Sequence, residues 1–67
     1  MAFAENLKAV RIERGYTQKQ LADMANITQP VITDYEKGRK QPLISTAVDI
    51  AKALGVTCEE LVNGEKE

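Results

Sequence analysis

The 67-residue sequence predicts a single all-α domain, residues 1–67, built from five short helices. Apolar residues recur at intervals of three and four along successive segments, and this spacing places them on one face of a helix. Two stretches, Thr17 to Gln20 and Thr57 to Glu60, match the capping box that begins a helix. No strand-like alternation or internal repeat interrupts this pattern. Five short helices are therefore expected to pack around one small core.

The first helix is expected to cover residues 1–14. Phe3, Leu7 and Val10 stand at positions i, i+4 and i+7, which gives this segment one apolar face. Gly15 follows and is typical of the residue that ends a helix, because glycine adopts left-handed backbone without steric cost. We assign the apolar face to the core.

A second helix is expected to begin at Thr17, whose hydroxyl can cap it while the Gln20 side chain reaches back. Tyr16 precedes the cap and is expected to pack against the helix as a hydrophobic staple. Asn26 is expected to end the helix, because asparagine tolerates left-handed backbone. The apolar face of this helix consists of Leu21, Ala22 and Ala25.

A third helix follows after a tight turn. Thr28 is placed to cap it, and Pro30 fits in the first turn, where its missing N–H is not needed. Two short helices joined in this way form a helix-turn-helix unit, here about residues 17–37, whose second helix enters the DNA major groove. The inward residues are expected to be Val31, Ile32 and Tyr35, and the outward ones Gln29, Pro30, Thr33 and Asp34.

The next segment is expected to be a loop, since Gly38 turns the chain and Pro42 prevents the helix from resuming. It carries three cations in four residues, Lys37, Arg39 and Lys40. Such a loop suits a phosphate backbone, although solvated cations on a loop are the simpler alternative.

Two more helices complete the chain. The fourth is expected over residues 45–54 and the fifth begins at the second capping box and ends at Asn63-Gly64. Residues 65–67 form an acidic tail that is expected to be frayed. The inward residues are expected to be Ala47, Ile50, Ala51 and Leu54 in the fourth helix, and Leu61 and Val62 in the fifth.

These segments together resemble the Cro and phage-repressor type of helix-turn-helix domain, also called the XRE family. The resemblance spans nearly the whole chain in the family's order and spacing. It is carried by Arg11, Thr17-Gln18, Leu21-Ala22, Ile27-Thr28-Gln29, Ile32, Glu36-Lys37-Gly38, Pro42 and Ala53-Leu54-Gly55-Val56. The resemblance implies a lambda-repressor-like fold that binds double-stranded DNA.

The resemblance and the chemistry of the outward residues together suggest a set of DNA contacts. Gln18 corresponds to a residue that contacts phosphate in the resembling repressors, and Gln29 can pair with adenine. Pro30 disfavours helical backbone at the preceding residue, which leaves the direction of Gln29 open. Asp34 either accepts from cytosine or is simply repelled by phosphate and paired with Lys37. The full set is Thr17, Gln18, Lys19, Thr28, Gln29, Pro30, Thr33, Asp34, Lys37, Arg39 and Lys40.

Two other roles follow from the resemblance. Arg11 and Glu36 match a pair that holds the recognition helix to the first helix, so we expect a partly buried ion pair between them. The segment opening the last helix, with Cys58 and Leu61, matches the contact between the two subunits of a dimer. Burial of Cys58 within its own subunit is the alternative.

The distribution of charge is more informative than the net charge of −1. Residues 1–40 carry seven cations and five carboxylates, a balance of +2, whereas residues 59–67 carry one cation and four carboxylates, a balance of −3. The acidic excess therefore lies away from the expected DNA-binding face.

Several functional classes are disfavoured by composition. The sequence has no histidine and one cysteine, so it does not supply a catalytic triad, a metal site or a disulfide. No apolar run reaches the length of a membrane span and no signal peptide is recognised. We therefore expect a cytoplasmic, non-enzymatic protein without a cofactor, a metal or an evident small-molecule ligand.

The function expected from these observations is a sequence-specific transcriptional regulator, a repressor that binds a two-fold operator as a homodimer. Two alternatives stay open at this point. One is a helix-turn-helix module that binds proteins, since the run Asp34-Tyr35-Glu36 and the acidic balance resemble multiprotein bridging coactivators. The other is an antitoxin that also regulates its own transcription.

Overall fold

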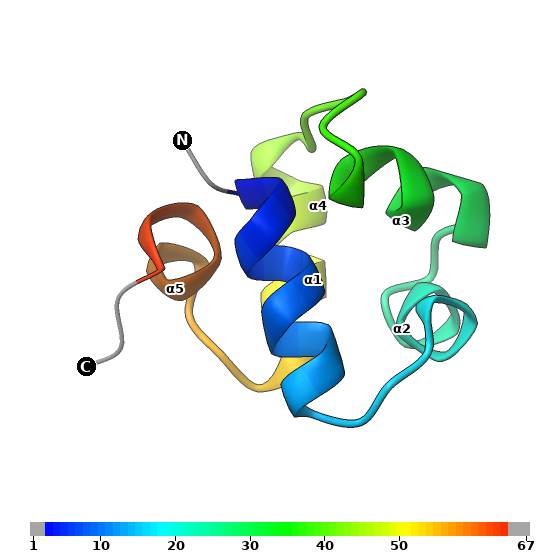
Figure 1. Cartoon of the computed structure of the whole chain (residues 1–67), viewed down its shortest axis with the longest axis horizontal. Helices are drawn as coiled ribbons and strands as arrows, with labels where there is room; N and C mark the ends of the chain where they lie inside the picture. Colours follow the sequence, from blue (N-terminus) through cyan, green and yellow to red (C-terminus); the bar gives the residue numbers. More distant parts are fainter. Residues whose placement is uncertain (1–2, 65–67) are drawn as a thin grey trace.

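The computed structural model describes residues 3–64, which fold into five helices without a strand. The helices are α1 (Phe3–Glu13), α2 (Gln18–Met24), α3 (Gln29–Glu36), α4 (Ile44–Leu54) and α5 (Cys58–Asn63). The predicted all-α fold of five short helices is confirmed (Figure 1). The first two residues of the expected first helix and the expected frayed tail, residues 65–67, lie outside the described residues.

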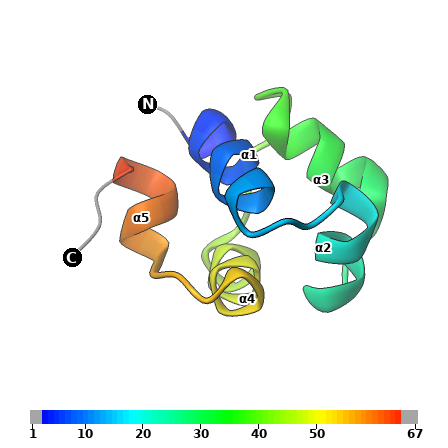
Figure 2. The ribbon, with the colours of Figure 1, turned by 60° about the horizontal axis from the view of Figure 1, so that its bottom comes forward.

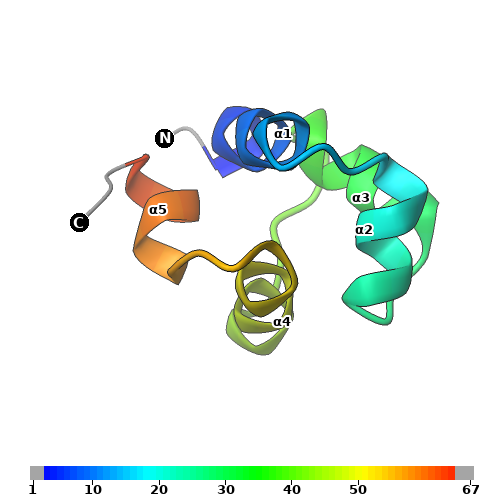
Figure 3. The ribbon, with the colours of Figure 1, turned by 90° about the horizontal axis from the view of Figure 1, so that it is seen from below.

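The helix α1 lies at the centre of the arrangement. It packs against α5 on one side and against α3 on the other (Figure 1). The helix α2 packs against both α3 and α4, and α4 also contacts α5. Figures 2 and 3 show α2 and α3 together at one end of the molecule and α5 at the opposite end. The helix-turn-helix unit therefore forms one end of the fold.

A single apolar cluster receives side chains from all five helices. Its fully buried large members share a branched aliphatic side chain, which packs densely without a polar atom to satisfy; they are Leu7, Leu21, Ile32, Ile50, Leu54 and Leu61. Tyr16 packs against the edge of this cluster, as expected of a residue placed just before the Thr17 cap. No helix within residues 3–64 is long and apolar enough to cross a membrane.

Two expectations about the C-terminal helices are corrected. The helix α4 begins at Ile44, one residue earlier than predicted, with Leu43 at a cap position that lacks a side-chain hydrogen bond. Val62 is 39% exposed rather than inward. The reason is the packing of α5: Leu61 fills the side that faces α1 and α4, and Val62 lies about 100° further round the helix, at the border of these contacts.

Candidate nucleic-acid interface

Local hydrogen bonds define the first helix of the unit. The Thr17 hydroxyl accepts from the Gln20 amide at 3.0 Å, and the Gln20 side chain accepts from the Thr17 amide at 2.8 Å. At the other end Asn26 has a φ of 61°, and the Ile27 amide donates to the Ala22 carbonyl at 2.9 Å. The predicted cap and the predicted left-handed stop of α2 are both confirmed.

The third helix begins differently from the expectation. Thr28 occupies the N-cap position of α3, but its side chain makes no capping hydrogen bond, so the predicted side-chain cap is wrong. Gln29 is the first residue of α3 and Pro30 the second, where proline is tolerated because its missing N–H would be unpaired in any case. Both side chains are exposed.

Aromatic packing fixes the inner face of α3 to α1. Ile32 is fully buried, and the Tyr35 ring meets the Phe3 ring edge to face, with 6.2 Å between ring centroids. Such aromatic pairs add about 0.5–1.5 kcal/mol beyond the area that they bury. The opposite face of α3 is open at Gln29 and Pro30 and half-buried at Thr33 and Asp34.

The predicted ion pair between Arg11 and Glu36 is confirmed. Arg11 donates from Nε to Glu36 Oε2 at 2.7 Å and from Nη2 to Oε1 at 3.1 Å, a two-point contact between α1 and α3. The third donor, Nη1, reaches the Tyr16 carbonyl at 2.8 Å. The side chains are only 12% and 4% exposed, so this pair is well shielded from solvent.

Gln18 extends this network to α2. Its Nε2 donates to Glu36 Oε1 at 3.0 Å, and its Oε1 accepts from the Thr33 hydroxyl at 2.9 Å. Thr33 also lies 3.2 Å from the Gln29 carbonyl, a second acceptor within the protein. The side chain of Gln18, which is predicted to contact phosphate, thus joins α2 to α3. One Gln18 amide hydrogen remains for an external acceptor.

The loop that carries Lys37, Arg39 and Lys40, here called the basic loop, is folded back over the end of α3. Asp34 Oδ1 lies 3.8 Å from Arg39 Nη1, and Asp34 Oδ2 lies 3.6 Å from Lys40 Nζ. The expected pair of Asp34 with Lys37 is therefore wrong, because the turn at Gly38 brings Arg39 and Lys40 to the carboxylate instead. Lys19 pairs with Asp23 at 3.4 Å on the exposed side of α2.

The two residues predicted for a dimer surface lie in different environments. Leu61 is fully buried in the core, so the prediction that its side chain takes part in a contact between subunits is wrong. Cys58 is half-buried, carries a free thiol and packs against the core. It shares a helix face with Val62, four residues later, which is exposed.

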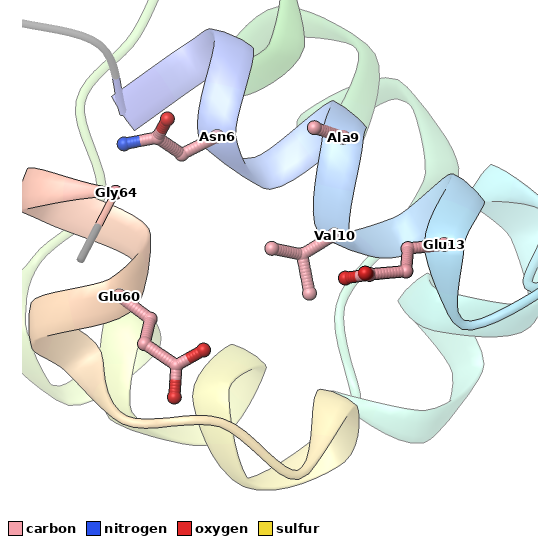
Figure 4. Close-up of a pocket in the computed structure, with 6 residues that line it drawn as sticks. All are labelled: Asn6, Ala9, Val10, Glu13, Glu60 and Gly64. Carbon is pink, nitrogen blue, oxygen red and sulfur yellow. The ribbon is translucent and has the colours of Figure 1, made fainter. Parts of the chain in front are cut away.

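Two hollows lie away from α3. Figure 4 shows the first, of about 330 Å³, between α1 and α5, with the Glu13 and Glu60 carboxylates among its lining side chains. Asn6 lies at its edge and donates to the Leu61 carbonyl at 3.0 Å. The second, between the end of α2 and α4, is lined by Met24, Ala25, Asn26, Asp49, Lys52 and Ala53. Neither lining includes a residue of α3 or of the basic loop.

Residues 7–61 match the family described as Helix-turn-helix. The uncharacterized HTH-type transcriptional regulator YqaE of Bacillus subtilis is 40% identical over 63 residues, which are 94% of this chain and 54% of that protein. The immunity repressor protein of Bacillus phage phi105 is 38% identical over 65 residues, 97% of this chain and 45% of that protein. The chain thus spans about half the length of these relatives.

The fold is shared with a solved phage repressor. The P22 c2 repressor protein, determined in complex with a synthetic operator, has a TM-score of 0.89 and 22% sequence identity, over 97% of this chain and 98% of that chain. At this identity the likeness concerns the fold. The resemblance inferred from Arg11, Glu36 and the residues around the turn is confirmed, and the chain belongs to the helix-turn-helix family of the Cro and phage-repressor type.

Proposed function

We propose that the chain is a sequence-specific DNA-binding transcriptional regulator, a repressor that binds a two-fold operator as a homodimer. The observation that carries this proposal is the position of α3. Its inner face is held by the Arg11–Glu36 pair and by the Phe3–Tyr35 contact, while Gln29 and Pro30 on the outer side are uncovered. A rigid helix with an open outer face is what entry into a major groove requires.

The charged loop supports the same function. Arg39 and Lys40 are 65% and 61% exposed and follow directly after α3, where they can reach the phosphates that flank a groove. The curated relatives named above are a transcriptional regulator and an immunity repressor, in agreement with the expectation that the chain is not an enzyme.

We propose that Gln29 reads a base, because it is exposed at the first turn of α3 and can form two hydrogen bonds to adenine. Thr17, Lys19, Thr28 and Lys37 are all exposed around the two helices and complete the proposed contact set with Gln18, Pro30 and Thr33. A protein-binding module would have no need for base preference at any of these positions.

In vitro selection of duplexes from a random pool tests this function. We expect recovery of a two-fold sequence with half-sites about 34 Å apart, and binding that weakens steeply with salt. Gln29→Ala should relax the preference at one base pair, whereas Lys52→Ala, an exposed position of α4, should preserve it. If no sequence is enriched and affinity does not change with salt, the protein-interaction module or the antitoxin becomes the better explanation.

For the homodimer we propose a contact that includes Cys58 and Val62, which lie on the same face of α5. Leu61 is not part of this contact because it is buried. Cys58→Arg places like charges together at the two-fold axis and should abolish cooperative operator binding while preserving the helical spectrum. Ile44→Arg is the comparison, since Ile44 is 84% exposed at the start of α4. If only Ile44→Arg prevents two-to-one binding, the contact lies at the start of α4 instead.

A further inference from the structure

The end of α3 has a hydrogen-bond pattern that determines which side chains meet there. The Gly38 amide donates to the Tyr35 carbonyl at 3.1 Å and the Arg39 amide donates to the Asp34 carbonyl at 2.9 Å, with Gly38 at a φ of 74°. These two bonds define a Schellman motif. The motif places the residue after the glycine beside the residue five positions earlier, here Arg39 beside Asp34.

The same motif ends three other helices with a different chemistry. In α1 the bond from Tyr16 to Arg11 pairs a cation with an uncharged aromatic residue. In α2 the bond from Ile27 to Ala22 brings two apolar residues together, and in α4 the bond from Val56 to Ala51 does the same. An apolar contact at these positions is the usual companion of the motif. The recognition helix has a charged pair at the corresponding positions, so the fold itself places a cation next to the carboxylate of Asp34.

Lys40 adds a second cation to the same carboxylate. The two oxygens of Asp34 face Arg39 and Lys40 at 3.8 Å and 3.6 Å respectively, and the Asp34 side chain is only 25% exposed although it lies on the outer side of α3. Both of these cations are in the set proposed to contact phosphate. A phosphate that binds them must therefore compete with a carboxylate that the helix terminus keeps in place.

We propose that Asp34 is a positioning residue that holds Arg39 and Lys40 against α3 and thereby limits the affinity of the protein for any duplex. The proposal rests on the proposed DNA-binding function. It acts through the phosphate contacts, which are common to all sequences, and not through a base. As a consequence, the protein binds non-specific DNA more weakly than it would if Arg39 and Lys40 were present without the Asp34 carboxylate.

The size of the effect follows from the exposure of the two ion pairs. Arg39 and Lys40 are largely exposed, and exposed ion pairs are weak and exchange readily with solvent or another anion. Loss of two such pairs should change the equilibrium constant for DNA binding by about two- to thirtyfold. Removal of the Asp34 charge should therefore strengthen binding within this range and not by many orders of magnitude.

The test measures the affinity of the whole chain for its selected operator and for a scrambled duplex across a salt series. Asp34→Asn should bind both duplexes about two- to thirtyfold more tightly at low salt, and its log–log salt slope should steepen by up to about 2, because both cations become available to phosphates. Asp34→Glu keeps the charge and should restore the wild-type slope. Asp49→Asn, an exposed change of equal charge on α4, is the control and should bind like wild type.

A double-mutant cycle separates this mechanism from direct repulsion of DNA by the carboxylate. With Arg39→Ala and Lys40→Ala already present, Asp34→Asn should no longer change the affinity or the slope. Three results would overturn the proposal: an undiminished effect of Asp34→Asn in that background, an unchanged affinity of the single variant, or a loss of preference at one base pair only. Circular dichroism checks that each variant is folded, and Asp34→Ser replaces Asp34→Asn if the latter is not. If wild type and every variant fail to bind any duplex, the proposed function is wrong as well.

Discussion

Removal of the Arg11 side chain should destabilise the whole domain, because this residue joins α1, α3 and the segment before α2. Arg11→Met deletes three hydrogen bonds, two to Glu36 and one to the Tyr16 carbonyl. It leaves the Glu36 carboxylate, 4% exposed, with Gln18 as its remaining partner in the network described above. A shielded carboxylate without its cation is the expected origin of the instability.

The magnitude follows from the burial of the pair. Loss of one partner from a fully buried ion pair costs about 3–5 kcal/mol. Arg11 is 12% exposed and Glu36 retains Gln18, so we expect the lower end of that range, about 3 kcal/mol. A domain of this length has a total stability on the order of 3–10 kcal/mol. The melting temperature should therefore fall by about 12 °C or more.

Thermal unfolding followed by circular dichroism measures this change. Lys19→Met is the matched control, since it removes a cation from a pair that is 73% and 68% exposed and should shift the melting temperature by less than about 4 °C. The double variant Arg11→Met with Glu36→Met should be more stable than Arg11→Met alone, because it removes the unpaired carboxylate. A melting temperature of Arg11→Met equal to that of the control would refute the reasoning.

Three further predictions concern other parts of the fold. Leu61→Ala should lower the free energy of unfolding by about 2–5 kcal/mol in urea titrations, because it opens a cavity at a fully buried position; a loss below about 1 kcal/mol would contradict the assignment of this side chain to the core. Gln18→Ala should cost about 1–3 kcal/mol in the same assay, because Glu36 and Thr33 each lose a hydrogen-bond partner; unchanged stability would show that the network is not maintained in solution. Lys40→Ala should weaken binding to all duplexes alike and reduce the log–log salt slope by about 1, and a change confined to one sequence would argue against a phosphate contact.

Local features of the fold were predictable from the sequence because they depend on residues close together in the chain. The capping boxes at Thr17 and Thr57 and the left-handed stop at Asn26 involve at most six consecutive residues, and the structure confirms them. The Arg11–Glu36 pair spans 25 positions and was predictable only through the family resemblance. The outward position of Val62 was missed, because the sequence does not show how much of the surface of α5 is covered by α1 and α4.

Tertiary structure alone decided what Gln18 and Asp34 contact. Gln18 lies 15 positions from Thr33 and 18 from Glu36, and no local pattern indicates that the packing of α2 on α3 would bring these side chains within hydrogen-bond distance. Leu61 was expected to face inward and also to take part in the subunit contact, and the contact of α5 with α1 decides for the buried position. The partner of Asp34 was chosen by helical spacing, whereas the chain reversal at Gly38 supplies Arg39 and Lys40. Periodicity determines which face of a helix is apolar, but the angle between helices and the path of the loop determine which polar groups meet.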